Sequence, residues 1–269
     1  MRRTIALFTA VCGLGVAGLT SWAQEPTPDA MQRAKSFRRK ITSTVSAHYL
    51  LFLPKHYDAK RTKPWPLILF LHGAGERGTN LGLVAKHGPP KIVKDRPDFP
   101  FIVVSPQCPP GECWNNDLLL ALLETVTSAY RVDTGRIYLT GLSMGGFGTW
   151  SLGLAYPEKF AALAPICGGG DTIPVLLAPP KKLQALKTLP IRAFHGAKDP
   201  AVNLAESQRM VEAVNQAGGQ AKLTVYPEAE HDSWTETYGN PDLYTWFLQH
   251  TRKPGAAKPG RRPGRQTGD

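Results

Sequence analysis

One serine of the chain stands between glycines directly after an apolar run, in the segment Gly141-Leu142-Ser143-Met144-Gly145. The pattern G-x-S-x-G is typical of a nucleophile elbow, a sharp turn between a strand and a helix that exposes the serine hydroxyl. Glycine suits the flanking positions because side chains there would clash with a strained, tight turn. The segment therefore predicts a nucleophilic serine at position 143. The alternative is a glycine-rich turn whose serine does no chemistry.

A serine hydroxyl is a weak nucleophile unless a neighbouring base removes its proton. The base is commonly a histidine that a carboxylate holds in place, and around an elbow the chain order is serine, acid, histidine. Asp199 follows the apolar run at 189–196, and His231 follows the apolar run at 221–227. We therefore predict a catalytic triad of Ser143, Asp199 and His231.

Other acidic and histidine side chains compete for these roles. His195 is the alternative base, although its place just before the turn that carries the acid favours a structural role. Asp171 follows the preceding strand and is the alternative acid. His72 is expected to shape the loop that stabilises negative charge. Asp232 should point away from its neighbour His231, because adjacent side chains diverge.

Two backbone N–H groups are expected to stabilise the oxygen that becomes negative during attack on a carbonyl group, each contributing about 3–4 kcal/mol. The first donor should be Met144, the residue after the nucleophile. The second should be Ala74, with Gly75 as the alternative, in the glycine-rich segment LHGAGERG that follows an apolar run. Glu76 and Arg77 of the same segment could pair and brace the loop. The other interpretation of this segment is an ordinary glycine-rich turn.

The elements that must position these residues follow from the apolar pattern. Strands are predicted at 48–54, 65–73, 101–106, 136–141, 160–168, 189–196 and 221–227. Helices are predicted at 117–130, 144–156, 203–217 and 241–250. Continuous apolar strands that alternate with helices predict an α/β fold with a mostly parallel central sheet and helices on both faces. Ligands bind such sheets at the carboxyl ends of the strands, which is where the predicted triad lies.

The first residues have the pattern of a signal peptide. Arg2 and Arg3 precede an apolar run at 5–19, and small residues allow cleavage after Ala23. We therefore predict a signal peptide over 1–23, export to the periplasm or the medium, and no stable membrane anchor after cleavage. The alternative is an uncleaved anchor, although the run is short for a membrane span of about 20 residues.

The remaining chain is predicted to hold a linker at 24–43, one catalytic domain at 44–250 and a disordered tail at 251–269. The tail is rich in proline, glycine and arginine, a composition that cannot form a packed core. Much of the formal net charge of +11 lies in this tail, so the charge does not indicate that the domain binds nucleic acid. The functional alternative for the tail is loose attachment to an acidic surface.

Three cysteines remain after removal of the signal peptide. Cys108 and Cys113 flank the short segment PPGE, and in an exported protein they could form a disulfide or remain thiols. Cys167 lies in an apolar strand and is expected to be a buried thiol. No nearby histidine pair completes a zinc site, so we expect no metal and no cofactor. Trp114 follows the cysteine pair and is predicted to form a wall of the substrate cleft, with core packing as the alternative.

The segments LHGAGERG, GLSMGGFGTW, FHGAKDP and EHDSW resemble the α/β-hydrolase superfamily. The chain is most similar to exported bacterial esterases of the feruloyl-esterase, polyhydroxybutyrate-depolymerase-like and predicted-peptidase kinds, over residues 45–248. The resemblance implies an α/β-hydrolase fold with Ser143 as nucleophile, Asp199 as acid and His231 as base. The two cysteines around PPGE depart from the expected pattern, which leaves that edge of the pocket undefined.

Together these patterns predict a serine esterase that hydrolyses short-acyl or polymer-linked carboxylic esters, such as acetyl or feruloyl esters, through an acyl-enzyme intermediate. The segment between Ser143 and Asp199 is too short for a large lid, although residues 168–189 could form a small flap. The alternatives are a serine peptidase of the same fold and a non-catalytic binding protein built on it. The patterns do not define the acyl group, the alcohol or the oligomeric state.

Overall fold

The computed structural model describes residues 35–60 and 63–252, and the chain divides into two units, Met1–Ser43 and Thr44–Asp269. The described part of the first unit forms no helix or strand, and its side chains are mostly exposed. The predicted signal peptide, the start of the predicted linker and the predicted tail from residue 253 onward lie outside the described residues. Within the described ranges, no helix is both long enough and apolar enough to span a bilayer.

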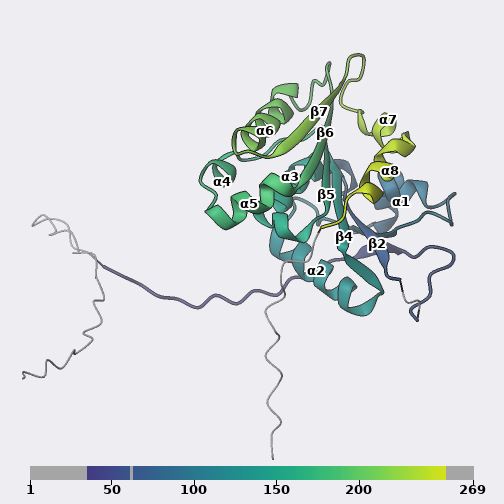
Figure 1. Cartoon of the computed structure of the whole chain (residues 1–269). Helices are drawn as coiled ribbons and strands as arrows, with labels where there is room; N and C mark the ends of the chain where they lie inside the picture. The colour runs from purple at the N-terminus through teal and green to yellow at the C-terminus, as the bar shows by residue number, and fades with distance from the viewer. Residues whose placement is uncertain (1–34, 61–62, 253–269) are drawn as a thin grey trace, which may run out of the picture. The chain divides into compact units, whose positions relative to one another are not determined.

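The second unit is built on a seven-stranded sheet in the order β1-β3-β2-β4-β5-β6-β7 (Figure 1). The strands are β1 (Tyr49–Phe52), β2 (Trp65–Leu71), β3 (Ile102–Pro106), β4 (Val132–Leu142), β5 (Ala162–Ile166), β6 (Pro190–Gly196) and β7 (Gln220–Tyr226). β1 pairs with β3 in antiparallel register, and every other neighbouring pair is parallel. The carboxyl ends of β2 and β4 to β7 therefore meet at one edge of the sheet.

Helices connect the strands and cover both faces of the sheet (Figure 1). The α-helices are α1 (Gly88–Ile92), α2 (Asn116–Ala129), α3 (Met144–Ala155), α4 (Ile173–Leu176), α5 (Pro180–Thr188), α6 (Leu204–Gln216), α7 (Trp234–Gly239) and α8 (Pro241–Gln249). Three 3₁₀ helices are η1 (Ala74–Glu76), η2 (Leu81–Lys86) and η3 (Pro157–Lys159). The Asn115 side chain accepts hydrogen bonds from the first-turn amides of Asp117 and Leu118, which fixes where α2 begins.

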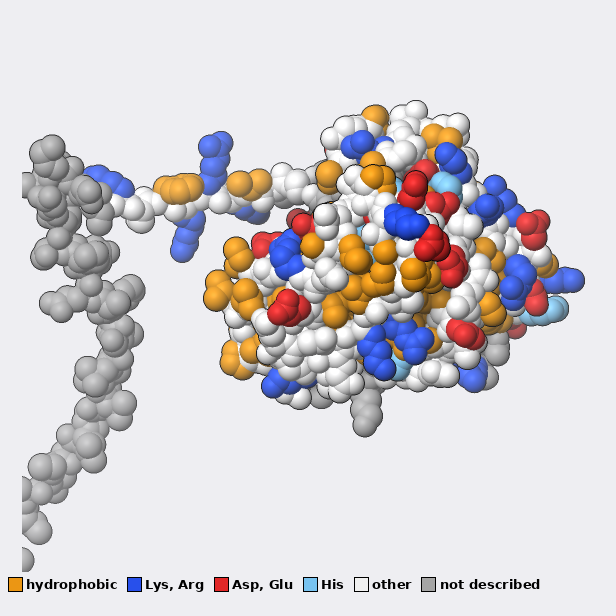
Figure 2. All heavy atoms as spheres, turned by 90° about the horizontal axis from the view of Figure 1, so that it is seen from above, with side chains coloured by type: hydrophobic (Ala, Val, Ile, Leu, Met, Phe, Trp, Pro, Cys, Tyr) orange, Lys and Arg blue, Asp and Glu red, His pale blue; other side chains and the backbone are white. Residues whose placement is uncertain are grey.

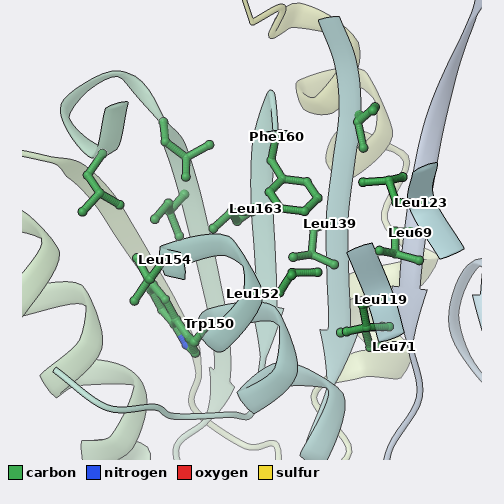
Figure 3. Close-up of a cluster of buried hydrophobic side chains, with 14 of the residues drawn as sticks. Leu69, Leu71, Leu119, Leu123, Leu139, Trp150, Leu152, Leu154, Phe160 and Leu163 are labelled. Atoms are coloured by element: carbon green, nitrogen blue, oxygen red, sulfur yellow. The ribbon is translucent and has the colours of Figure 1, made fainter. Parts of the chain in front are cut away.

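Alternation along the strands divides the core between the two faces of the sheet. In β2, Leu67, Leu69 and Leu71 belong to one cluster, and Ile68 and Phe70 belong to the other. The first cluster includes side chains of α2, α3, α5 and α6, and Figure 3 shows its leucines on α2, on α3 and on the adjacent strands. The second cluster packs against α7 and α8. The sheet is thus covered on both sides.

The predicted fold class is confirmed, since a mostly parallel sheet lies between two helical layers. Each predicted strand is present within a few residues of its expected bounds. The segment 168–189, predicted as a small flap, contains the two short helices α4 and α5. Apolar side chains gather across the middle of the face shown in Figure 2, with acidic and basic side chains interspersed around them.

Candidate active site

The turn between β4 and α3 holds Ser143 in a strained conformation, with φ of 53° and ψ of −119°. Its glycine neighbours are required because the turn packs closely on the end of β2. A Cβ on Gly145 would lie 2.0 Å from the carbonyl oxygen of Leu71, and a Cβ on Gly141 would lie 2.3 Å from that of Gly145. The Ser143 amide donates to the Ile166 carbonyl of β5 at 3.0 Å. The turn therefore has the geometry of a nucleophile elbow.

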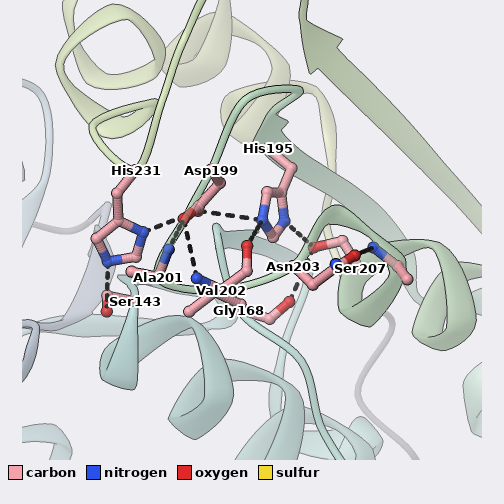
Figure 4. Close-up of polar contacts among 10 residues, drawn as sticks. Ser143, Gly168, His195, Asp199, Ala201, Val202, Asn203, Ser207 and His231 are labelled. Carbon is pink, nitrogen blue, oxygen red and sulfur yellow. Dashed lines mark hydrogen bonds and ion pairs between the residues drawn. The ribbon is translucent and has the colours of Figure 1, made fainter.

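The three side chains predicted to act together do lie together (Figure 4). His231 Nε2 is 3.0 Å from Ser143 Oγ, and His231 Nδ1 is 2.8 Å from Asp199 Oδ2. The Asp199 side chain is completely buried, whereas that of His231 is 25% exposed. The imidazole thus bridges a buried carboxylate and a more accessible hydroxyl, which is an arrangement that can move a proton from the serine.

Asp199 is held as a carboxylate by the turn that follows β6. Burial acts to raise the pKa of this group, but the hydrogen bonds from His231 and from the Val202 and Ala201 amides outweigh it and hold the pKa below its ordinary value. Both amides donate to Oδ1 at 2.9 Å, so Oδ2 is left to face the imidazole. Trp234 packs edge-on against the His231 ring at 5.1 Å between centroids, which further restricts it.

The competing residues lie elsewhere or act differently. Asp171 is exposed, and its Oδ1 accepts a hydrogen bond from the Ile173 amide at the start of α4. Asp232 accepts hydrogen bonds from both the backbone and the side chain of Thr235, so it points away from its neighbour. His195 is fully buried and contacts Asp199 from the other side, with Nε2 3.2 Å from Oδ2.

The two predicted oxyanion donors both stand at the start of a helical turn. Ala74 begins η1 and Met144 begins α3, so neither amide has an intrahelical acceptor. The Gly73 amide is already engaged, because it donates to Glu76 Oε2 at 3.0 Å. Within the described residues, the amides of Ala74 and Met144 have no hydrogen-bond acceptor of their own. They are therefore available to an incoming oxygen.

The predicted pairing of Glu76 with Arg77 is wrong. Glu76 turns inward, where its carboxylate accepts from the loop amide and lies 3.8 Å from His87 Nε2. Arg77 turns outward and donates to the carbonyl oxygens of Ala74 and Glu112. The two side chains brace the loop separately, because the buried Glu76 carboxylate accepts from the Gly73 N–H and Arg77 donates to carbonyl oxygens.

His72 contacts the glycine-rich loop that carries Ala74. Its Nδ1 is 2.6 Å from the Gly73 carbonyl, and its Nε2 accepts the Cys108 amide at 3.0 Å. Burial lowers the pKa of this histidine, which keeps the ring neutral with its proton on Nδ1. Trp114 Nε1 donates to the His72 carbonyl at 3.2 Å. The histidine therefore contacts the glycine-rich loop, as expected, and also connects the end of β2 to the cysteine loop.

Comparison with known proteins agrees with this geometry. The dienelactone hydrolase family matches residues 111–242. A solved structure titled a thermostable esterase aligns with a TM-score of 0.63 and 34% identity, covering 78% of this chain and 60% of its own. The chain has the α/β-hydrolase fold, which it shares with this esterase.

Two further similar proteins are named for their activities. A structure titled ferulic acid esterase aligns with a TM-score of 0.59 at 20% identity, over 74% of this chain and 89% of its own. A bifunctional acetylxylan esterase/xylanase from Neocallimastix patriciarum is 29% identical over 129 residues, which are 46% of this chain. The match spans only 17% of that protein, so it compares one domain with part of a larger chain.

A cavity of about 420 Å³ adjoins the nucleophile of this α/β-hydrolase. Its lining residues are Cys113, Trp114, Ser143, Met144, Phe147, Gly148 and Ser151. Trp114 therefore lines this cavity, and it also packs against the core cluster. A Cβ on Gly148 would lie 2.8 Å from Trp114 Cδ1, so the glycine makes room for the indole ring. The larger hollows of the domain, of about 470 Å³ each, contain no residue of the triad.

The three described cysteines of the α/β-hydrolase are free thiols. Burial raises the pKa of Cys108 to about 11 and that of Cys167 to about 12, so both remain protonated. Cys167 also forms, with Asp199 and His231, the one grouping of metal-ligating side chains found among the described residues. Both ring nitrogens of that histidine are already engaged, and the thiol is neutral, so we assign the grouping no metal.

One functional contact escaped the sequence analysis. The oxygen Oδ2 of Asp199 faces two imidazoles, His231 on one side and His195 on the other (Figure 4). The spacing of four residues between His195 and Asp199 was visible in the sequence. Which way the buried ring points depends on α6, which supplies the Ser207 hydroxyl, and local sequence does not define that packing.

Proposed function

We propose that this chain is a serine esterase that hydrolyses carboxylic esters through an acyl-enzyme intermediate. The observation that carries the proposal is the continuous contact from Asp199 through His231 to Ser143 Oγ, beside a cavity of about 420 Å³. The names of similar proteins, which include a thermostable esterase and an acetylxylan esterase, support the same reaction class.

In the first step, His231 Nε2 accepts the proton of Ser143 Oγ as this oxygen attacks the ester carbonyl carbon. The carbonyl oxygen becomes negative and accepts hydrogen bonds from the Met144 and Ala74 amides. Asp199 accepts a hydrogen bond from His231 Nδ1–H throughout, which selects the tautomer and stabilises the protonated ring. The tetrahedral intermediate then collapses as the same histidine gives its proton to the leaving alcohol.

In the second step, water enters where the alcohol has left, and His231 removes one of its protons. The water oxygen then attacks the acyl carbon and forms a second tetrahedral intermediate. Its negative oxygen accepts hydrogen bonds from the same two amides. Collapse releases the carboxylic acid and returns the proton to Ser143. The cycle consumes one water molecule and needs no external proton carrier.

The proposed substrates are short-acyl or polymer-linked esters. The cavity wall is formed largely by aromatic and aliphatic side chains, with Trp114, Met144 and Phe147 among them. Phe147 is also exposed to solvent at its rim, so an acyl group attached to a larger chain could enter. The names ferulic acid esterase and acetylxylan esterase support aromatic and acetyl esters as the first candidates. The signal-peptide pattern supports export of the enzyme to the periplasm or the medium.

The test replaces Ser143 with alanine and measures hydrolysis of p-nitrophenyl acetate by the purified protein. We expect kcat/KM to fall by at least about a thousandfold, because the nucleophile is lost. Ser128→Ala is the matched control, since this serine is exposed on α2 and should leave turnover unchanged. Wild-type turnover by Ser143→Ala would overturn the proposal. Parallel assays with short peptides test the peptidase alternative, which would be preferred if peptides were cleaved faster than esters.

A further inference from the structure

His195 is a completely buried histidine for which the proposed reaction has no use. It lies in β6, and its two ring nitrogens contact different partners (Figure 4). Nδ1 is 2.7 Å from the Ser207 hydroxyl of α6. Nε2 is 2.9 Å from the Val202 carbonyl oxygen and 3.2 Å from Asp199 Oδ2. These contacts allow the protons to be counted.

The Ser207 hydroxyl has a single proton to donate. Its oxygen lies 2.8 Å from the carbonyl oxygen of Gly168, and a carbonyl can only accept. The hydroxyl proton is therefore donated to Gly168, and Ser207 Oγ is left to accept from His195 Nδ1. On the other side of the ring, the Val202 carbonyl and the ionised Asp199 also only accept, so Nε2 must donate as well.

Neither neutral tautomer satisfies this environment. With the proton on Nδ1 alone, the Nε2 lone pair would face the Val202 carbonyl and the Asp199 carboxylate. With the proton on Nε2 alone, the single Ser207 hydroxyl proton could be donated either to His195 Nδ1 or to the Gly168 carbonyl oxygen. The other of these two contacts would then join two acceptors with no proton between them. The buried ring has no solvent that could relieve either conflict.

We propose that His195 is a buried imidazolium that donates from both nitrogens, pairs with Asp199, and thereby moderates the negative charge that the carboxylate presents to His231. The effect on catalysis rests on the proposed function, whereas the protonation of the ring does not. His195 is a positioning residue, since it reaches the reacting serine only through the acid and the base.

The charged groups around the ring leave Asp199 as its principal counterion. On α6, Glu206 precedes the serine partner but pairs with Arg209. The Cys167 thiol, which lies within 4.8 Å of both Asp199 and His231, is neutral. After β7, Asp232 is directed into its contacts with α7. Two imidazoles therefore share one carboxylate oxygen, and one of them is charged throughout.

His72 provides an internal control, because it is also buried but its contacts require only one ring proton. Its Nδ1 donates to the Gly73 carbonyl, and its Nε2 accepts from the Cys108 amide. One nitrogen therefore has a donor as its partner, and a neutral ring satisfies both contacts. In the same protein, His72 should have one ring proton and His195 should have two.

The direct test is ¹⁵N NMR of the full chain labelled at histidine, recorded at pH 8. We expect both ring nitrogens of His195 to be protonated and only Nδ1 of His72. The signals are assigned with His195→Gln, or with Ser207→Ala if the first variant does not fold. A single protonated nitrogen on His195 at pH 8 would overturn the proposal, whether or not the chain proves to be an esterase.

The functional test is the pH dependence of kcat/KM for His195→Gln, whose neutral amide can still donate to the Val202 carbonyl and to Asp199. Without the positive charge, the carboxylate favours the protonated form of His231 more strongly. The pH below which kcat/KM falls, as His231 becomes protonated, should therefore rise by about one unit. A folded variant with lower kcat but no rise in this pH would show a merely structural role and contradict the proposal.

Discussion

Substitution of Gly145 by alanine tests whether the elbow is fixed by its contact with β2. The new Cβ would lie 2.0 Å from the Leu71 carbonyl oxygen and 2.7 Å from that of His72, whereas ordinary contacts begin at 3.4 Å. The backbones would have to separate by about 1.4 Å, and neither can turn aside as a side chain would. Overpacking of this kind costs about 3 kcal/mol, which lowers the melting temperature by about 6–12 °C for a domain of this size.

The same displacement should affect chemistry, because the elbow carries Ser143 and the Met144 amide. A shift of about 1 Å at reacting groups lowers the rate by about a hundredfold. Thermal unfolding and p-nitrophenyl acetate hydrolysis measure the two effects. The matched control is Gly239→Ala, at a glycine with no atom within 4 Å of the added Cβ, and it should match the wild-type protein in both assays. If Gly145→Ala had the melting temperature and turnover of Gly239→Ala, the contact with β2 would not fix the elbow.

Three further predictions concern the triad and the loop beside it. Asp199→Asn should lower kcat by about 10⁴-fold with little change in KM, because the amide no longer favours the required tautomer of His231; steady-state kinetics measure both constants, and an unchanged kcat would contradict the assigned role. Because the pKa of Asp199 is held below its ordinary value, its ionised form stabilises the folded state above the unfolded pKa of about 3.9, and this contribution is lost as pH falls through the lower folded value. Urea titrations from pH 6 to pH 2 should therefore show a smaller acid-induced loss of stability for Asp199→Asn than for the wild-type protein. Trp114→Phe removes the hydrogen bond to the His72 carbonyl but keeps an aromatic wall, so kcat should fall more than the affinity for an aromatic ester changes; a pure KM effect would show that the tryptophan acts only as a wall.

The sheet and the meeting of the triad could be predicted because both depend on short-range signals. Long apolar runs mark buried strands, and the carboxyl ends of parallel strands share one edge, so residues that follow β4, β6 and β7 must approach each other. The glycines around Ser143 make the turn recognisable in the sequence, because a larger residue would not fit where the turn meets β2. That these side chains catalyse ester hydrolysis stays a prediction.

Other features depend on contacts that local sequence does not define. α4 and α5 begin at or next to prolines and lack a long apolar period, so their segment could be predicted only as a flap. The orientation of Glu76 depends on the Gly73 amide, three residues before it, and on His87, which follows η2 in the same connection. The second imidazole on Asp199 depends on α6 packing against β6. For Glu76 and for Asp199, a partner outside the local segment decides what the side chain contacts.

The central claim is that Ser143 is deprotonated by a neighbouring imidazole and attacks an electrophilic centre. It is tested most directly by treating the folded protein with a fluorophosphonate probe and locating the adduct by peptide mass spectrometry. We predict one adduct, on Ser143, which forms much more slowly after His231→Gln. Absence of labelling in folded wild-type protein, or an adduct on a different serine, would contradict it.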